Sequence, residues 1–364
     1  MMSEHKIGLI IDDDFAYKHI PPYPKPSFIS FENPYRIKFI LDHLAEWNLI
    51  ESDKIITLSP KPINDRILEL AHSKYHIDSI KRVSNVGGGV IGEEVFVSKD
   101  TFLLARKAVG GAIRALECVI NNEVSQSFAL IRPPGHHAMR ETAAGLCIFN
   151  NIANAILYVR KYCDFKEKIA IIDIDNHFGD GLARYFYEDP SVLYYSIHEF
   201  DFGEGDLGMI NEIGIGKGLG TNINIPIPPE STNEDFFECF DLMDAIIRQY
   251  KPELIIVATG FDMYYADPIG NCLFTSKAYY EFAKFILNLS KEICHGNLSF
   301  ILEGGYSLIG LPYCVKAIIK AILNEEYFQP EFELHVASLK SKGNNEIQKI
   351  NMLIKELIKP FWNL

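Results

Sequence analysis

The chain has 364 residues, of which 48% are hydrophobic and 23% are charged, a balance typical of a globular protein with a sizeable core. Its net charge of −13 argues against direct nucleic-acid binding, because phosphate binding needs a basic surface that releases counterions. The polar start, Met1 to Lys6, and the lack of a membrane-length apolar run predict no membrane segment and a cytoplasmic location. This composition leaves both a monomer and a homo-oligomer open.

Seven cysteines are scattered along the chain without a C-x-x-C pair. Their spacing indicates neither a disulfide framework nor a thiolate zinc site. We expect most of them to be buried thiols.

Hydrophobic periodicity predicts strands alternating with helices throughout the chain. The predicted strands are 6–11, 55–58, 127–131, 168–172, 192–197, 222–225, 254–258 and 298–302, and the main predicted helices are 34–47, 64–71, 101–121, 151–163, 233–250, 276–293, a helix ending at Leu323, and 347–358. The proline-rich segment 21–26, the glycine triplet 87–89 and the glycine-rich stretch 201–220 read as loops.

This alternation predicts an α/β fold with a mostly parallel central sheet and helices on both faces. We place the main domain at residues 1–330 and a helical extension at 331–364. The amphipathic segment 347–358 predicts that this extension packs on the domain or on a partner.

Ionisable side chains follow the buried strand 168–172. Strand alternation puts Asp173, Asp175 and His177 on one side as long as the chain stays extended, so Asp175 and His177 can converge on a metal ion. A carboxylate beside an imidazole suits zinc or ferrous iron. The competing interpretation of this motif alone is a polar turn that caps the next helix.

Three further turns place reactive groups directly after predicted strands. The pair His136 and His137 follows Arg132-Pro-Pro-Gly and offers two imidazoles suited to proton transfer. Asp262 follows the strand 254–258, and Tyr306 follows the strand 298–302. Open α/β sheets carry their sites at the carboxyl ends of strands, so we expect one functional site.

Four motifs occur in order: R-P-P-G-H-H-A, I-D-I-D-N-H-F-G-D-G, G-F-D-x-x-x-x-D-P and E-G-G-Y. Together they resemble the histone deacetylase and acetylpolyamine amidohydrolase superfamily, over roughly residues 7–322. The resemblance implies a single-domain, arginase/deacetylase-like fold and a zinc-dependent amidohydrolase.

The resemblance also implies roles for individual residues. It implies that the zinc ligands are Asp175, His177 and Asp262, and that the catalytic residues are His136, His137 and Tyr306, with Asp173 and Asp180 orienting the histidines. It implies a structural K⁺ held by Asp173, Asp175, His177, Ser196 and Ile197. It also implies a substrate tunnel that includes Gly145, Leu146, Phe202, Ile269 and Gly304, and an internal channel lined by Arg36.

On this interpretation a single zinc ion polarises an amide carbonyl and acidifies a water molecule, with His137 as general base and acid and Tyr306 stabilising the oxyanion. The substrate is an acylated lysine or an acylated polyamine. Ile269 at the tunnel mouth favours acyl-lysine. The acidic residues Glu93, Glu94, Glu204 and Asp206, if they border the mouth, favour a cationic amine instead.

Leu146 departs from the pattern, because it stands where an aromatic residue usually forms one tunnel wall. Two other functions fit the motifs. One is a ureohydrolase with two manganese ions, which needs additional Asp and His ligands that bridge the metals. The other is a catalytically silent protein that binds acyl groups.

Overall fold

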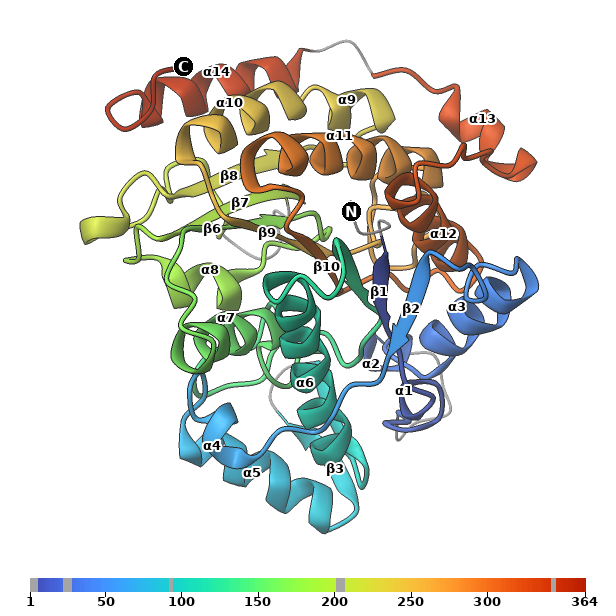
Figure 1. Cartoon of the computed structure of the whole chain (residues 1–364). Helices are drawn as coiled ribbons and strands as arrows, with labels where there is room; N and C mark the ends of the chain where they lie inside the picture. The colour runs from blue at the N-terminus through green and yellow to red at the C-terminus, as the bar shows by residue number, and fades with distance from the viewer. Residues whose placement is uncertain (1–5, 22–27, 92–93, 201–206, 342–344) are drawn as a thin grey trace. The chain divides into compact units, whose positions relative to one another are not determined.

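The computed structural model describes residues 6–21, 28–91, 94–200, 207–341 and 345–364 (Figure 1). Contacts divide the chain into two compact units of three stretches each. Unit 1 comprises Met1–Lys166, Asp180–Tyr185 and Ser299–Leu308, and unit 2 comprises Glu167–Gly179, Phe186–Leu298 and Ile309–Leu364.

Unit 1 has the strand order β2-β1-β5-β10, and β1 pairs parallel with both of its neighbours. The long helix α6 lies beside α7 in Figure 1 and packs against β1 and β5. Its elements are β1 Ile7–Ile10, α1 Asp14–Tyr17, α2 Phe28–Phe31, α3 Tyr35–Glu46, β2 Ile55–Leu58, α4 Asp65–Leu68, α5 Lys74–Asn85, β3 Gly88–Ile91, β4 Val95–Ser98, α6 Thr101–Ile120, β5 Gln126–Ala129, α7 Asn151–Tyr162, α8 Asp180–Phe186 and β10 Leu298–Leu302.

Two predictions in unit 1 are wrong in detail. The glycine triplet was expected to be a loop, but β3 pairs antiparallel with β4. The predicted helix 64–71 is only the short α4, and α5 was not predicted. The buried face of α5 contains His76 and Ser84 beside its isoleucines, so a pattern of apolar residues alone does not reveal it.

Unit 2 has the strand order β9-β6-β7-β8, and β6 pairs parallel with both β7 and β9. Helices α10, α11 and α14 lie together above strands β8 and β9 in Figure 1. Its elements are β6 Ile169–Asp173, β7 Val192–Glu199, η1 Gly216–Gly218, β8 Asn222–Ile227, α9 Asn233–Phe237, α10 Phe240–Tyr250, β9 Leu254–Thr259, α11 Ser276–Cys294, α12 Gly310–Ile322, η2 Glu331–Glu333, α13 Leu334–Ala337 and α14 Glu346–Ile358.

The strands of unit 2 are buried on both faces, as their continuous apolar sequences predict. The expected helix 233–250 is broken between α9 and α10. The parallel pairing in both units confirms the predicted α/β architecture.

Residues of the carboxyl-terminal extension pack on unit 2. Glu333 is fully buried and accepts hydrogen bonds from the hydroxyls of Tyr264 (3.0 Å) and Ser276 (2.5 Å). On α14, Ile347, Ile354 and Ile358 are buried. These contacts make the extension part of the core of unit 2.

All seven cysteines are free and six of them are buried, which confirms the prediction of buried thiols. Within the described ranges, no helix combines the length and the apolar character that crossing a membrane would need.

Candidate metal centre

Three side chains of unit 2 converge at the carboxyl ends of β6 and β9. The potential ligand atoms of Asp175, His177 and Asp262 all lie within 4.8 Å of one another. The Nδ1 atom of His177 is 3.1 Å from Oδ2 of Asp262 and 3.4 Å from Oδ1 of Asp175. Because β6 and β9 are parallel neighbours, the residues that follow them reach the same edge of the sheet.

The backbone after β6 turns instead of staying extended. Backbone N–H groups bind the nearby carboxylates: Asp175 N donates to Asp173 (3.1 Å), His177 N to Asp175 (3.0 Å), and Asn176 N to Asp262 (2.8 Å). The expected strand alternation through His177 is therefore wrong, since β6 ends at Asp173. Convergence of the ligands comes from this hydrogen-bonded turn.

A glycine is required where β9 meets this turn. A Cβ atom added at Gly260 would lie 2.3 Å from Oδ2 of Asp175. Any side chain at this position would displace the Asp175 carboxylate from the trio.

The electrostatics of the trio suit a cation. Burial and the adjacent Asp175 raise the pKa of Asp262. Burial lowers the pKa of His177, but hydrogen bonds and charge from Asp175 and Asp262 outweigh it and raise the pKa well above its usual value. Two carboxylates and one imidazole nitrogen aimed at a single point are a donor set that fits zinc or iron.

The residues expected to hold a monovalent cation lie beside β6. Asp173 is fully buried and pairs in register with Ser196 of β7, next to Ile197. The hydroxyl of Tyr194 donates to Asp173 (2.8 Å). The structure brings these residues together, while the K⁺ ion itself stays a prediction.

The tandem histidines belong to unit 1 and follow β5. Their ring centroids are 4.0 Å apart. The Glu303 carboxylate, which follows the neighbouring strand β10, accepts hydrogen bonds from the backbone N–H groups of Gly135 (2.6 Å) and His136 (3.1 Å). Glu303 thereby ties the histidine turn to the turn that carries Tyr306.

His137 has a carboxylate partner. Its Nδ1 lies 3.0 Å from Oδ1 of Asp180, the first residue of α8. Burial raises the pKa of Asp180, but the hydrogen bond and charge of His137 outweigh it and lower the pKa below its usual value. Because an ionised carboxylate only accepts, Nδ1 of His137 carries the hydrogen, and Nε2 is the atom suited to exchange a proton.

A tight loop covers the His137 ring. Gly145 has φ +48°, and a Cβ atom there would lie 2.4 Å from Cδ2 of His137. Leu146 follows with φ +64° and is buried. Sequence reasoning missed His72, which anchors this loop: its Nε2 accepts from Asn150 N (2.9 Å) and its Nδ1 donates to the Met139 carbonyl (3.0 Å).

Arg36 holds the Tyr306 turn. Its buried guanidinium donates to the backbone carbonyls of Glu303 (2.5 Å) and Gly305 (2.7 Å) and lies 4.6 Å from the centroid of the Tyr306 ring. Gly304 is buried between these two carbonyls. The predicted channel residue thus contacts the turn that carries Tyr306 directly.

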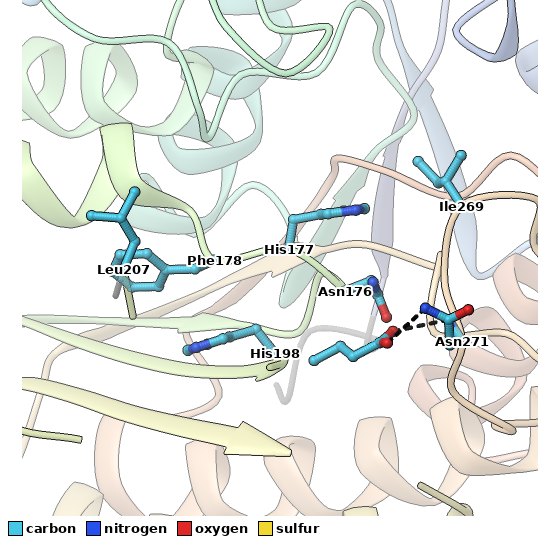
Figure 2. Close-up of a pocket in the computed structure, with 8 residues that line it drawn as sticks. Asn176, His177, Phe178, His198, Leu207, Ile269 and Asn271 are labelled. Atoms are coloured by element: carbon cyan, nitrogen blue, oxygen red, sulfur yellow. Dashed lines mark hydrogen bonds between the residues drawn. The ribbon is translucent and has the colours of Figure 1, made fainter. Parts of the chain in front are cut away.

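Eight residues of unit 2 line a cavity of about 40 Å³ (Figure 2). They are Asn176, His177, Phe178, His198, Glu199, Leu207, Ile269 and Asn271. Ile269, expected at the tunnel mouth, therefore shares a cavity with His177, a candidate metal ligand. The expected tunnel residue Phe202 and the acidic residues Glu93, Glu204 and Asp206 lie outside the described residues.

Sequence reasoning missed Glu199 and Asn271. Asn271 donates to the Glu199 carboxylate through its backbone N–H (2.9 Å) and its side-chain amide (2.8 Å). One signal was available, because Glu199 is the last residue of β7 and so occupies another strand end at the same edge.

The family model for the histone deacetylase domain matches residues 30–322. The chain belongs to the histone deacetylase family. It is 34% identical over 319 residues to a probable deacetylase of Archaeoglobus fulgidus, a match that covers 86% of each chain. It is also 31% identical over 353 residues to histone deacetylase HDA1 of Candida albicans, covering 88% of this chain and 41% of that relative.

The fold agrees with this membership. A crystal structure of the HD domain of HDA15 superposes with a TM-score of 0.84, covering 99% of this chain and 96% of that one at 24% sequence identity. This likeness confirms the predicted deacetylase-like α/β fold.

Proposed function

We propose that this histone deacetylase family protein is a zinc-dependent amidohydrolase that removes an acetyl or other acyl group from an amine. The convergence of Asp175, His177 and Asp262 within 4.8 Å carries the proposal. The family membership and the names of the archaeal and fungal relatives support the same reaction.

The reaction adds water across an amide bond. A zinc ion held by the trio would polarise the acyl carbonyl and make a coordinated water more acidic. The water oxygen forms a bond to the carbonyl carbon, the C–N bond then breaks, and the products are a carboxylate and an amine.

The roles of the side chains in this reaction follow from their contacts. Asp180 keeps the hydrogen of His137 on Nδ1, so that Nε2 takes the proton of the water and returns one to the departing amine. Tyr306 donates a hydrogen bond to the tetrahedral oxyanion, a contact worth about 3 kcal/mol in acyl-transfer enzymes. Arg36 keeps the Tyr306 turn in place through two backbone carbonyls.

A panel of substrates tests the proposal. Protein loaded with zinc is assayed for amine release from acetyl-lysine peptides, longer acyl-lysines and acetylated polyamines, with a chelated sample as the control. We expect zinc-dependent turnover of at least one class. Absence of turnover on every acylated amine, with one zinc bound per chain, would leave an acyl-binding protein as the better interpretation; two manganese ions per chain would favour a ureohydrolase.

A further inference from the structure

We propose that Glu333 is a positioning residue for the metal centre, because it fixes the turn that carries Asp262 through a hydrogen bond from Tyr264. The carboxyl-terminal extension would then set the affinity of the protein for zinc. Glu333 lies outside residues 30–322, the part of the chain that the family model matches. This inference rests on the proposed function, since it takes the trio as the zinc site.

A tight turn after β9 carries Asp262. The backbone N–H of Tyr264 donates to the carbonyl of Phe261 (3.2 Å), which closes a four-residue turn with Asp262 at its second position. The Asp262 carboxylate accepts from Asn176 N (2.8 Å), and its Oδ2 lies 3.1 Å from Nδ1 of His177. A shift of Tyr264 would therefore move the backbone that holds a candidate ligand.

Packing and one hydrogen bond hold the side chain of Tyr264. The ring is buried, and a Cβ atom added at Gly310 would lie 2.0 Å from its Cε1 atom. The ring thus fits against the first residue of α12 only because that residue is glycine. The hydroxyl donates to Oε1 of Glu333 (3.0 Å), which supplies the acceptor that a buried hydroxyl needs.

The Glu333 carboxylate joins the two ends of the connection between β9 and α11. Oε1 binds Tyr264 near the start of this connection. Oε2 accepts from the backbone N–H (3.1 Å) and the hydroxyl (2.5 Å) of Ser276, the first residue of α11. The amino-terminal end of this 19-residue helix favours a negative charge, and the full burial of Glu333 shields these bonds from water. One carboxylate therefore holds both ends of the segment that contains Asp262.

A competing explanation is purely structural. The hydrogen bonds of Glu333 could serve only to attach the carboxyl-terminal extension to unit 2. In that case their loss would lower the melting temperature but would leave the zinc affinity of the folded protein unchanged.

The zinc dissociation constant of the full chain separates the two explanations. Competition with a chromophoric chelator measures this Kd, and a thermal melt of each variant accompanies it. Tyr264→Phe keeps the buried ring and removes only the hydroxyl, whereas Glu333→Gln removes the charge at nearly constant shape. We expect each variant to raise the zinc Kd about tenfold, as is typical for groups that orient metal ligands. The double variant should have the same Kd as the single variants, because all three lose the same hydrogen bond.

Glu331→Gln is the matched control, since Glu331 belongs to the same short helix η2, is exposed, and its loss changes the net charge equally. An unchanged zinc Kd in Tyr264→Phe and Glu333→Gln would overturn the inference and support the structural explanation. A double variant whose Kd rises by the product of the two single effects would also overturn it, since Glu333 would then act independently of Tyr264. If the wild type binds zinc but turns over no acylated amine, the proposed function fails, and the same comparison of Kd values still decides the role of Glu333.

Discussion

At the scale of single residues, the carboxylates next to His137 and His177 have different effects. Asp180 accepts a hydrogen bond from Nδ1 of His137 and keeps one hydrogen on that atom. Asp175 and Asp262 both face Nδ1 of His177, which produces a site with excess negative charge. The first arrangement suits proton transfer and the second suits a metal cation.

Replacing His137 by Ala or Tyr306 by Phe should lower kcat by about a hundredfold or more. Neither residue belongs to the ligand trio, so zinc content and melting temperature should stay close to wild type. Steady-state kinetics together with metal analysis checks this. A variant with bound zinc and wild-type turnover would remove that residue from the mechanism.

Replacing Asp262 by Ala should abolish tight zinc binding, because an imidazole and one carboxylate leave the ion under-coordinated. We expect the zinc content of dialysed protein to fall from about one per chain to near zero. Asp267→Ala is the control, since Asp267 is also buried on the same loop but accepts from Ile269 N outside the trio. Zinc retained in Asp262→Ala and lost in the control would reverse the assignment.

At the scale of elements, the turns that carry the site residues follow strands that are neighbours in the sheet. In unit 1, β5 precedes the tandem histidines and its neighbour β10 precedes Tyr306. Buried Glu32, in the connection between α2 and α3, binds both Arg132 (2.7 Å) and Arg36 (3.3 Å). It thereby links Arg132, which precedes the histidine turn, to Arg36, which holds the Tyr306 turn. In unit 2, the three candidate metal ligands follow the neighbouring strands β6 and β9 in the same way.

Helix α14 offers adjacent residues in opposite environments. Ile354 is 1% exposed and Leu353 is 51% exposed. Ile354→Ala should lower the free energy of unfolding by about 2–4 kcal/mol, because it leaves a cavity under the helix. Leu353→Ala should change it by about 0.5 kcal/mol or less. Urea denaturation measures both, and equal effects would show that α14 does not pack on unit 2 in solution.

At the scale of the whole molecule, buried neutral histidines make stability depend on pH. Burial lowers the pKa of His72 to about 3 and that of His198 to about 4, against about 6.5 in an unfolded chain. Unfolding therefore takes up protons below about pH 6.5. The stability due to these groups is fully present above that pH and is lost as the pH falls towards their folded-state pKa values.

The free energy of unfolding should accordingly fall by about 1 kcal/mol or more per pH unit between pH 6.5 and 4.5. Denaturant titrations at several pH values measure this slope. His72→Gln, which removes one buried imidazole, should flatten it, whereas His335→Gln removes an exposed one as the control. An identical slope in His72→Gln and the wild type would contradict the assignment of a neutral buried His72.

The sequence by itself determined the α/β alternation and the family, and it predicted the candidate ligand trio Asp175, His177 and Asp262. Runs of apolar residues predict buried strands, and the reactive side chains of a motif lie within a few consecutive residues. Only the tertiary structure decided that the chain turns after Asp173, that Arg36 holds the carbonyls beside Tyr306, and that Glu199 shares a cavity with His177. The turn after Asp173 combines local hydrogen bonds with one from Asn176 N to the distant Asp262, and the other two features depend wholly on segments far apart in the chain, such as Arg36 and Gly305. Local periodicity carries no information about which distant segments meet.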